Sequence, residues 1–162
     1  MCFRSLNSKA RTAKRNITVY KLVQVTNFVP TMMLKIAHPE LKTKSQRTVI
    51  FNSQYMSYEY IIGLEYKEKL FKESLQGKTT GKGFYSWREI ERAKMALVGA
   101  SFPEGFGLAQ YVVLKCVIPK GSMYYVSRAD SISPGQFCSN RIRPVGYRLI
   151  TDKEKDWRTE PF

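Results

Sequence analysis

Apolar and polar residues alternate along much of the chain, and this predicts a protein built mainly from β-strands. The clearest alternation covers residues 55–66, where every second residue from Met56 to Tyr66 is apolar or aromatic. β-branched runs and further two-residue periods predict strands at 17–25, 32–37, 47–52, 110–118, 122–128, 137–142 and 145–150. Turns are expected at 27–30 and at 119–121, and the second turn predicts a hairpin between its flanking strands.

A single helix is predicted at about residues 87–98. Ser86 and Glu89 have the S-x-x-E spacing of a capping box, in which each side chain bonds the backbone N–H of the other residue. Ile90, Ala93 and Leu97 follow at helical spacing and form an apolar stripe. The expected fold class is therefore α+β, with a mainly antiparallel sheet and one prominent helix.

Length and charge divide the chain further. A chain of 162 residues, 43% of them apolar, suits a single packed domain. We expect a basic N-terminal arm at 1–16, the α+β domain at 17–151 and a charged, loose tail at 152–162.

Positive charge is concentrated near the N-terminus. The formal net charge is +14, and residues 1–47 contribute +9 of it, from ten basic side chains and one acidic one. Such a distribution is typical of a polyanion-binding protein, although a solvated basic face would serve solubility alone. The residues expected to form the basic arm are Arg4, Lys9, Arg11, Lys14 and Arg15.

A glycine- and lysine-rich segment precedes the predicted helix. Helix starts expose unpaired backbone N–H groups and carry partial positive charge, so this segment predicts a seat for phosphate or another anion. A flexible solvent loop is the alternative interpretation. The candidate anion-binding residues are Lys78, Thr79, Thr80, Lys82, Ser86 and Arg88.

The same segment is not a P-loop. That motif needs a glycine five residues before Gly77, where this chain has Lys72, and a helix that begins at the lysine. Phosphate hydrolysis by this motif is therefore excluded.

Reactive and metal-binding residues are few. Three cysteines and one histidine, with no paired ligand spacing, predict no metal site and no cofactor. An odd number of cysteines and no secretory leader predict free thiols in the cytoplasm, with Cys116 in the core and Cys138 undecided. No apolar run is long enough for a bilayer, so no membrane partner is expected. Tyr58, Tyr60 and Tyr66 suit either core packing or base stacking, and we favour the core.

Several segments resemble small uncharacterised proteins of phages and their Bacteroidota-type hosts. The similarity rests on Met1-Cys2, the basic arm, the segment Ile-Thr-Val-Tyr-Lys from Ile17, Gly-Phe-Tyr-Ser-Trp from Gly83 and Cys-Val-Ile-Pro-Lys-Gly-Ser from Cys116. It implies a phage-encoded protein that acts in the host cytoplasm, as a counter-defence or host-takeover protein.

Residues 111–125 resemble the strand-PKG-strand element of ADP-ribosyltransferases. That resemblance implies an NAD site built from an early strand, here at Tyr20 and Lys21, a Ser-Thr-Ser strand, here at Ser86, and a final strand with a catalytic glutamate. Residues 136–142 would supply the final strand, and they contain no acid.

Taken together, the sequence predicts a non-enzymatic basic module that binds nucleic acid or a nucleotide. Two alternatives stay open: an ADP-ribosyltransferase-like enzyme with a degenerate active site, and a module that docks on an acidic protein partner.

Overall fold

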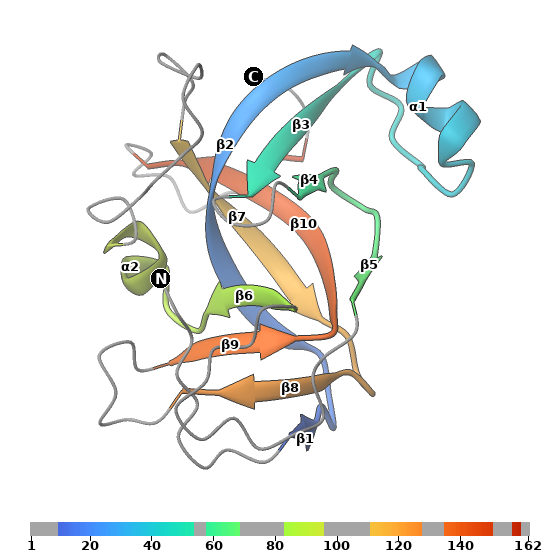
Figure 1. The fold of residues 1–162 in the computed structure, drawn as a ribbon. Coiled ribbons are helices and arrows are strands. Elements are labelled where there is room, and N and C mark those ends of the chain that lie inside the picture. Colours follow the sequence, from blue (N-terminus) through green and yellow to red (C-terminus); the bar gives the residue numbers. More distant parts are fainter. Residues whose placement is uncertain are drawn as a thin grey trace.

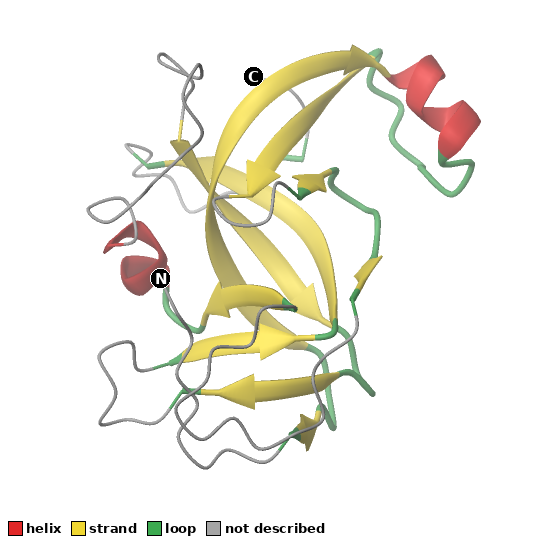
Figure 2. Cartoon of the chain, viewed as in Figure 1, coloured by secondary structure: helices red, strands yellow, loops and turns green. Residues whose placement is uncertain are grey.

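The computed structural model describes residues 10–53, 58–68, 83–95, 111–127, 135–150 and 157–159. Within these ranges the chain forms ten strands and two short helices, shown in Figures 1 and 2. The elements are β1 (Arg11–Thr12), β2 (Ile17–Pro30), α1 (Thr31–Ala37), β3 (Arg47–Ser53), β4 (Glu59–Tyr60), β5 (Tyr66–Lys67), β6 (Phe84–Trp87), α2 (Ile90–Met95), β7 (Tyr111–Ile118), β8 (Met123–Val126), β9 (Gln136–Ser139) and β10 (Arg141–Leu149).

All ten strands belong to one sheet, and each described pair is antiparallel. Neighbouring strands follow the order β1-β8-β9-β6-β2-β7-β10-β5, while β3 pairs with β2 and β4 pairs with β3. The predicted antiparallel sheet is confirmed. Helix α2 begins at Ile90 and not at the predicted residue 87, and residues 96–98 of the predicted helix lie outside the described ranges.

The long strand β2 organises the sheet, and Figure 1 shows it curving along the whole height of the molecule. Residues from Ile17 to Gln24 pair with β7, and residues from Val23 to Pro30 pair with β3, with a register shift between Val25 and Asn27. The turn predicted at 27–30 is therefore wrong. The bulge bends the strand, which continues beyond it as one arm of a hairpin with β3. Pro30 is the last residue of β2, so its missing N–H removes no hydrogen bond from the middle of the sheet.

At the tip of this arm, residues 32–37 form part of helix α1 and not the predicted strand. Thr31 and Leu34 face inward, three residues apart, whereas Met32, Met33 and Ile36 are 79%, 63% and 84% exposed. The inward pair has helical spacing, and the short apolar run does not distinguish a strand from a helix on its own.

The alternating stretch at 55–66 is not one strand in its described part, and residues 55–57 lie outside the described ranges. From residue 58 on, the structure forms β4 and β5 with a turn between them, in which Gly63 has φ of 93° and Leu64 N donates to Ile61 O at 3.3 Å. A left-handed residue interrupts an extended strand, so the alternation is broken at this glycine.

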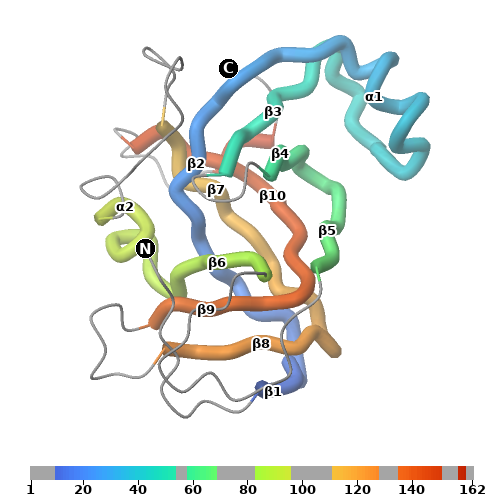
Figure 3. Tube along the Cα trace, in the orientation of Figure 1, coloured from blue at the N-terminus to red at the C-terminus, as the bar shows by residue number. Residues whose placement is uncertain are grey.

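The turn at Pro119 to Gly121 is confirmed, and Gly121 has φ of 87°. The expected hairpin is not, because β8 leaves β7 and pairs with β1 and β9 (Figure 3). The two strands predicted at 137–142 and 145–150 are β9 and β10, but Pro144 lies inside β10 at a register shift instead of between two strands. A bulge tolerates a residue without an N–H.

The main core joins buried side chains from β2, β3, β4, β6, β7, β9 and β10. The predicted inward row of β7 is fully buried, with Cys116 at 0% exposure, and the aromatic side chains around Tyr60 pack against it. Tyr60 meets Tyr66 edge-on, with ring centroids 5.2 Å apart, so these tyrosines serve packing. The inward residues of β7 are Val112, Leu114, Cys116 and Ile118.

No helix in the described ranges has the length and apolar character needed to cross a membrane.

Candidate anion-binding groove

Two separate sources of positive charge meet in one groove of about 790 Å³. One wall comes from the segment 11–18, of which residues 11–16 belong to the predicted basic arm. The other comes from Arg88, which follows β6, a strand that β8 and β9 separate from β1 in the sheet. We call this hollow the basic groove. Its lining residues are Arg11, Thr12, Lys14, Arg15, Asn16, Ile17, Thr18, Arg88, Tyr124, Val126 and Phe137.

The segment 11–16 is part of the fold and not a detached arm. Arg11 and Thr12 pair with Tyr124 and Met123 of β8. Ala13 N donates to Ser122 O, and Gly121 N donates to Ala13 O, both at 2.8 Å. Ala13 itself is 2% exposed, so an apolar side chain anchors the segment between its exposed basic neighbours.

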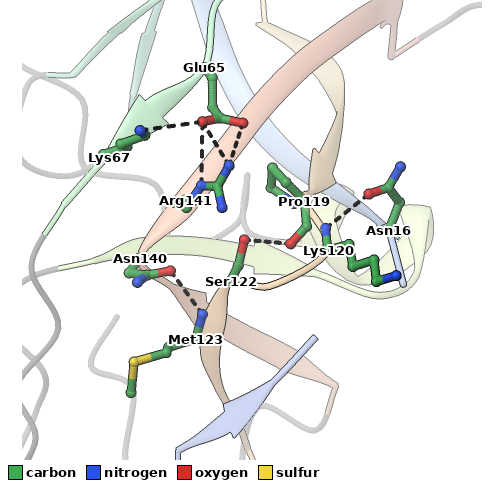
Figure 4. A network of polar contacts seen from close by, with 9 residues as sticks. All are labelled: Asn16, Glu65, Lys67, Pro119, Lys120, Ser122, Met123, Asn140 and Arg141. Carbon is green, nitrogen blue, oxygen red and sulfur yellow. Dashed lines mark hydrogen bonds and ion pairs between the residues drawn. The ribbon is translucent and has the colours of Figure 1, made fainter. Parts of the chain in front are cut away.

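The β7–β8 turn also fixes the end of this segment, as Figure 4 shows. Asn16 Oδ1 accepts a hydrogen bond from Lys120 N at 2.9 Å, and Ser122 Oγ donates to Pro119 O at 2.5 Å. Polar side chains thereby satisfy backbone groups that the turn leaves without strand partners.

A second set of polar contacts fixes the start of β8 and the end of β9. Asn140 Oδ1 accepts from Met123 N at 2.9 Å, and the neighbouring Arg141 guanidinium grips Glu65 with Nη2 distances of 3.1 and 3.0 Å to its two carboxylate oxygens (Figure 4). Lys67 completes this ion-pair group at 4.0 Å from Glu65. Asn140 therefore fixes the start of the strand that carries Tyr124, while the ion pairs join β10 to the segment at β5.

Arg88 is held by its backbone. Its N–H donates to Gly135 O at 3.0 Å, across the register in which Trp87 pairs with Gln136. Gly135 has φ of 75°, and a Cβ added there would lie 3.9 Å from Arg88 Cβ. The side chain of Arg88 is exposed and takes part in lining the groove.

The floor of the basic groove is apolar. Ile17, Tyr124 and Val126 are half-buried and pack against the main core, and Phe137 is 6% exposed. The rings of Tyr124 and Phe137 lie 5.6 Å apart with an interplanar angle of 44°. The groove thus offers an apolar, partly aromatic surface beneath a cationic rim.

The electrostatics of the rim favour an anion. Arg11, Lys14, Arg15 and Arg88 are exposed, and none of the described residues that line the groove is acidic. Clefts lined by one sign of charge concentrate ligands of the opposite sign. Arginine also offers a planar fork of donors that matches phosphate oxygens.

Several predicted anion-binding residues lie outside the described part of the chain. These are Arg4 and Lys9 of the arm, and Lys78, Thr79, Thr80 and Lys82 of the glycine-rich segment. Of the predicted residues that are described, Arg11, Lys14, Arg15 and Arg88 come together in the basic groove.

The capping role expected for Ser86 is wrong. Ser86 lies inside β6, is 0% exposed and pairs with Phe137 of β9, so it precedes the helix as a strand residue. Its Oγ has no hydrogen-bond partner among the described residues. The S-x-x-E spacing therefore spans the end of β6 and the start of α2, which two residues separate.

Tyr20, Lys21 and Ser86, the residues of the alternative NAD cleft, do not line a common cleft. Tyr20 stacks on Trp157 with ring centroids 5.6 Å apart, while Lys21 is 7% exposed and its Nζ lies 5.6 Å from the centroid of the core residue Tyr60. Successive residues of a strand point to opposite faces. Lys21 and Ser86 therefore belong to the core side, and Tyr20 to the opposite face of β2.

The amine of Lys21 has an unusual environment. Burial lowers the pKa of Lys21 from 10.5 to about 8, although nearby Cys116 and Cys138 act in the opposite direction. Nζ donates to Tyr85 O and contacts the Tyr60 ring, which partly replaces its hydration. Burial also raises the pKa of Cys116 to about 12, so this thiol stays protonated and inert.

The tail departs from the expectation of a loose segment where it is described. Trp157 packs on Tyr20 and lies under Lys115 and Arg148, with cation–ring distances of 5.5 and 5.3 Å. Tyr147 and Arg158 exchange two backbone hydrogen bonds of 2.9 Å. Gly146 permits this approach, because a Cβ there would come within 3.1 Å of Trp157 Cβ.

A second hollow, of about 410 Å³, lies beside β3. The cations Lys42 and Arg47 line it together with Glu40. This mixture of signs makes it a weaker anion site than the basic groove. In the described ranges, His, Cys, Asp and Glu form no group of three or more that would hold a metal ion.

Sequence reasoning missed the floor of the groove. Tyr124, Val126 and Phe137 carry ordinary strand patterns, and only the pairing of β8 with β1 and β9 brings them beneath Arg11 and Arg88. The local sequence indicated only the cationic side of the groove, through the cluster of basic residues at 11–15.

No protein-family model, curated protein or solved structure matches this chain. The function is therefore argued from the groove.

Proposed function

We propose that the protein is a non-enzymatic module that binds nucleic acid or a nucleotide in the basic groove. The observation that carries the proposal is the meeting of the N-terminal cations with Arg88 above the apolar floor. Cations neutralise phosphate groups, and the floor accepts the flat apolar face of a base. A surface that served only solubility would need the charge and not the floor.

The salt dependence of binding tests the phosphate contacts. For single strands, the logarithm of the binding constant falls against the logarithm of salt concentration with a slope of about −0.7 per phosphate contact. We expect Arg88→Gln to make the slope shallower by about this amount and to weaken binding at low salt. Fluorescence anisotropy with a labelled oligonucleotide measures both quantities.

The matched control is Lys35→Gln, which removes one positive charge from α1, far along the chain from the groove. It should leave the slope unchanged. If both variants weaken binding equally, only the net charge matters and the groove is not the site. Binding that is insensitive to salt would contradict the proposal altogether.

An ADP-ribosyltransferase-like activity is the second candidate, and one observation favours it. The strands that the resemblance assigns to an NAD site are neighbours in the order β9-β6-β2, which puts the strands of Lys21 and Ser86 side by side. Against it, β9 consists of Gln136 to Ser139 and has no acid, and Tyr20 points to the other face. A thermal shift with NAD, together with transfer of an ADP-ribose mass to a protein or nucleic acid, would establish this activity in place of simple binding.

A further inference from the structure

We infer that the ligand of the basic groove is single-stranded nucleic acid, held by a base that stacks on Tyr124 while its phosphates meet the rim. This inference rests on the proposed function and specifies the ligand class. The proposed function needs the cationic rim above an apolar floor, and this inference adds that the floor binds an unpaired base of a strand.

The floor would be unused by a duplex. The side chains of Ile17 and Phe137 and the ring face of Tyr124 are apolar surfaces that carry no charge for a phosphate group. In a duplex each base is paired and both its faces are covered by neighbouring bases, so a duplex would present mainly phosphates to the rim. An unpaired base can instead place its face on an aromatic side chain.

Tyr124 is the ring best placed for this contact. It is half-buried and lines the groove, whereas Phe137 is 6% exposed and supports Tyr124 from the core side. β8 fixes the Tyr124 backbone between β1 and β9, through its pairing with Arg11 and Ser139. A rigid ring loses little entropy when a base stacks on it.

The rim also fits a strand better than a free nucleotide. Its cations lie on two walls, with Arg11, Lys14 and Arg15 on one and Arg88 on the other. Phosphates that recur along a strand can meet both walls while a base occupies the floor between them. Thr12, Asn16 and Thr18 add polar groups to the groove. Because stacking is tolerant of base identity, we expect little sequence preference.

The experiment compares a fluorescent oligothymidylate of about 12 nucleotides with a blunt duplex of the same length, at the same salt concentration. Anisotropy should show tighter binding of the single strand, by about 5- to 100-fold, which is the range that one or more stacked bases supply. Tyr124→Leu should remove this preference, and Tyr124→Phe should keep it.

Tyr111→Leu is the matched control, since Tyr111 is a half-buried strand tyrosine that does not line the groove. It should bind the single strand as the unaltered protein does. A strand that contains 2-aminopurine gives a readout that needs no variant, because stacking quenches its fluorescence. Quenching on binding supports the inference, and unchanged fluorescence overturns it.

The other outcomes separate the two claims. Equal, salt-sensitive binding of duplex and single strand overturns the single-strand inference and leaves the proposed function standing. ATP is also added at the oligonucleotide concentration that saturates the protein. If ATP then displaces the oligonucleotide, the groove is assigned to a free nucleotide and the inference is overturned. Binding to none of the three would overturn both.

Discussion

At the residue scale, Lys21 is a normally charged side chain at a strand position that the fold buries. The pattern of β2 places residue 21 on the core face between Val19 and Val23, which are both 0% exposed. An ammonium group there loses its water and receives one carbonyl and one ring in exchange. The result is a folded-state pKa of about 8, below the ordinary 10.5.

This depressed pKa predicts that Lys21→Met stabilises the protein. Because the folded-state pKa of Lys21 lies below its unfolded value, the unfolded state binds the proton more tightly, and the penalty for folding is complete below pH 8. The penalty declines as pH rises from 8 to 10.5. We expect the variant to gain about 3 kcal/mol in the free energy of unfolding at pH 7 and about 2 kcal/mol at pH 9.

Urea unfolding of both proteins at the two pH values measures the gain. Taking the difference between the two proteins cancels the effect of other groups that titrate above pH 9, such as Cys116. Lys35→Met, on the exposed face of α1, is the control and should gain nothing. A gain for Lys21→Met that did not shrink at pH 9 would show that the amine is not the cause.

At the element scale, the β7–β8 turn links the core to the groove. Gly121 donates its N–H to Ala13 O, and Ser122 O accepts from Ala13 N, so the turn holds the segment that carries Arg11, Lys14 and Arg15. The left-handed φ of Gly121 makes this geometry accessible.

We therefore expect Gly121→Ala to weaken both stability and ligand binding. Nothing lies within 4 Å of an added Cβ, so the cost is backbone strain alone, about 1 kcal/mol in the free energy of unfolding. Thermal unfolding measures the stability, and oligonucleotide anisotropy measures the binding.

Gly63→Ala is a closely matched control for this change. Gly63 also has a positive φ, of 93°, with nothing within 4 Å of an added Cβ, but its N–H bonds Pro144 O, away from the groove. It should lose similar stability and bind normally. Equal loss of binding in both variants would show that the turn has no specific role in the groove.

At the scale of the whole molecule, the charge of +14 affects folding and binding in opposite ways. Like charges on a compact chain repel one another, and salt shortens the Debye length from about 30 Å at 0.01 M to about 10 Å at 0.1 M. Screening should therefore help the folded state while it weakens attraction for phosphates.

Raising sodium chloride from 0.01 to 0.3 M should accordingly raise Tm, by about 2–4 °C if screening contributes about 1 kcal/mol. Over the same range, oligonucleotide binding should weaken. Differential scanning fluorimetry and anisotropy on one preparation measure the two trends. A fall in Tm would mean that attractive ion pairs, such as that of Arg141 with Glu65, outweigh the repulsion.

Much of the strand content could be predicted from sequence, because a strand prediction needs only the local two-residue period. The strands β2, β3, β7, β9 and β10 follow predicted runs, with altered ends. Three of the errors occurred where one residue changes the path of the chain. These positions are the bulge after Val25, the left-handed Gly63 and Pro144 inside β10.

The sequence alone determined an antiparallel, strand-rich protein with its positive charge near the N-terminus, because periodicity and charge are local properties. Only the tertiary structure decided which strands are neighbours. That order brings Arg11 to Arg88 over Tyr124, buries Lys21 and separates it from Tyr20. The physical reason is that strand pairing joins residues far apart in the chain, so the partner of a strand is set by the packing of the whole sheet and not by its own pattern.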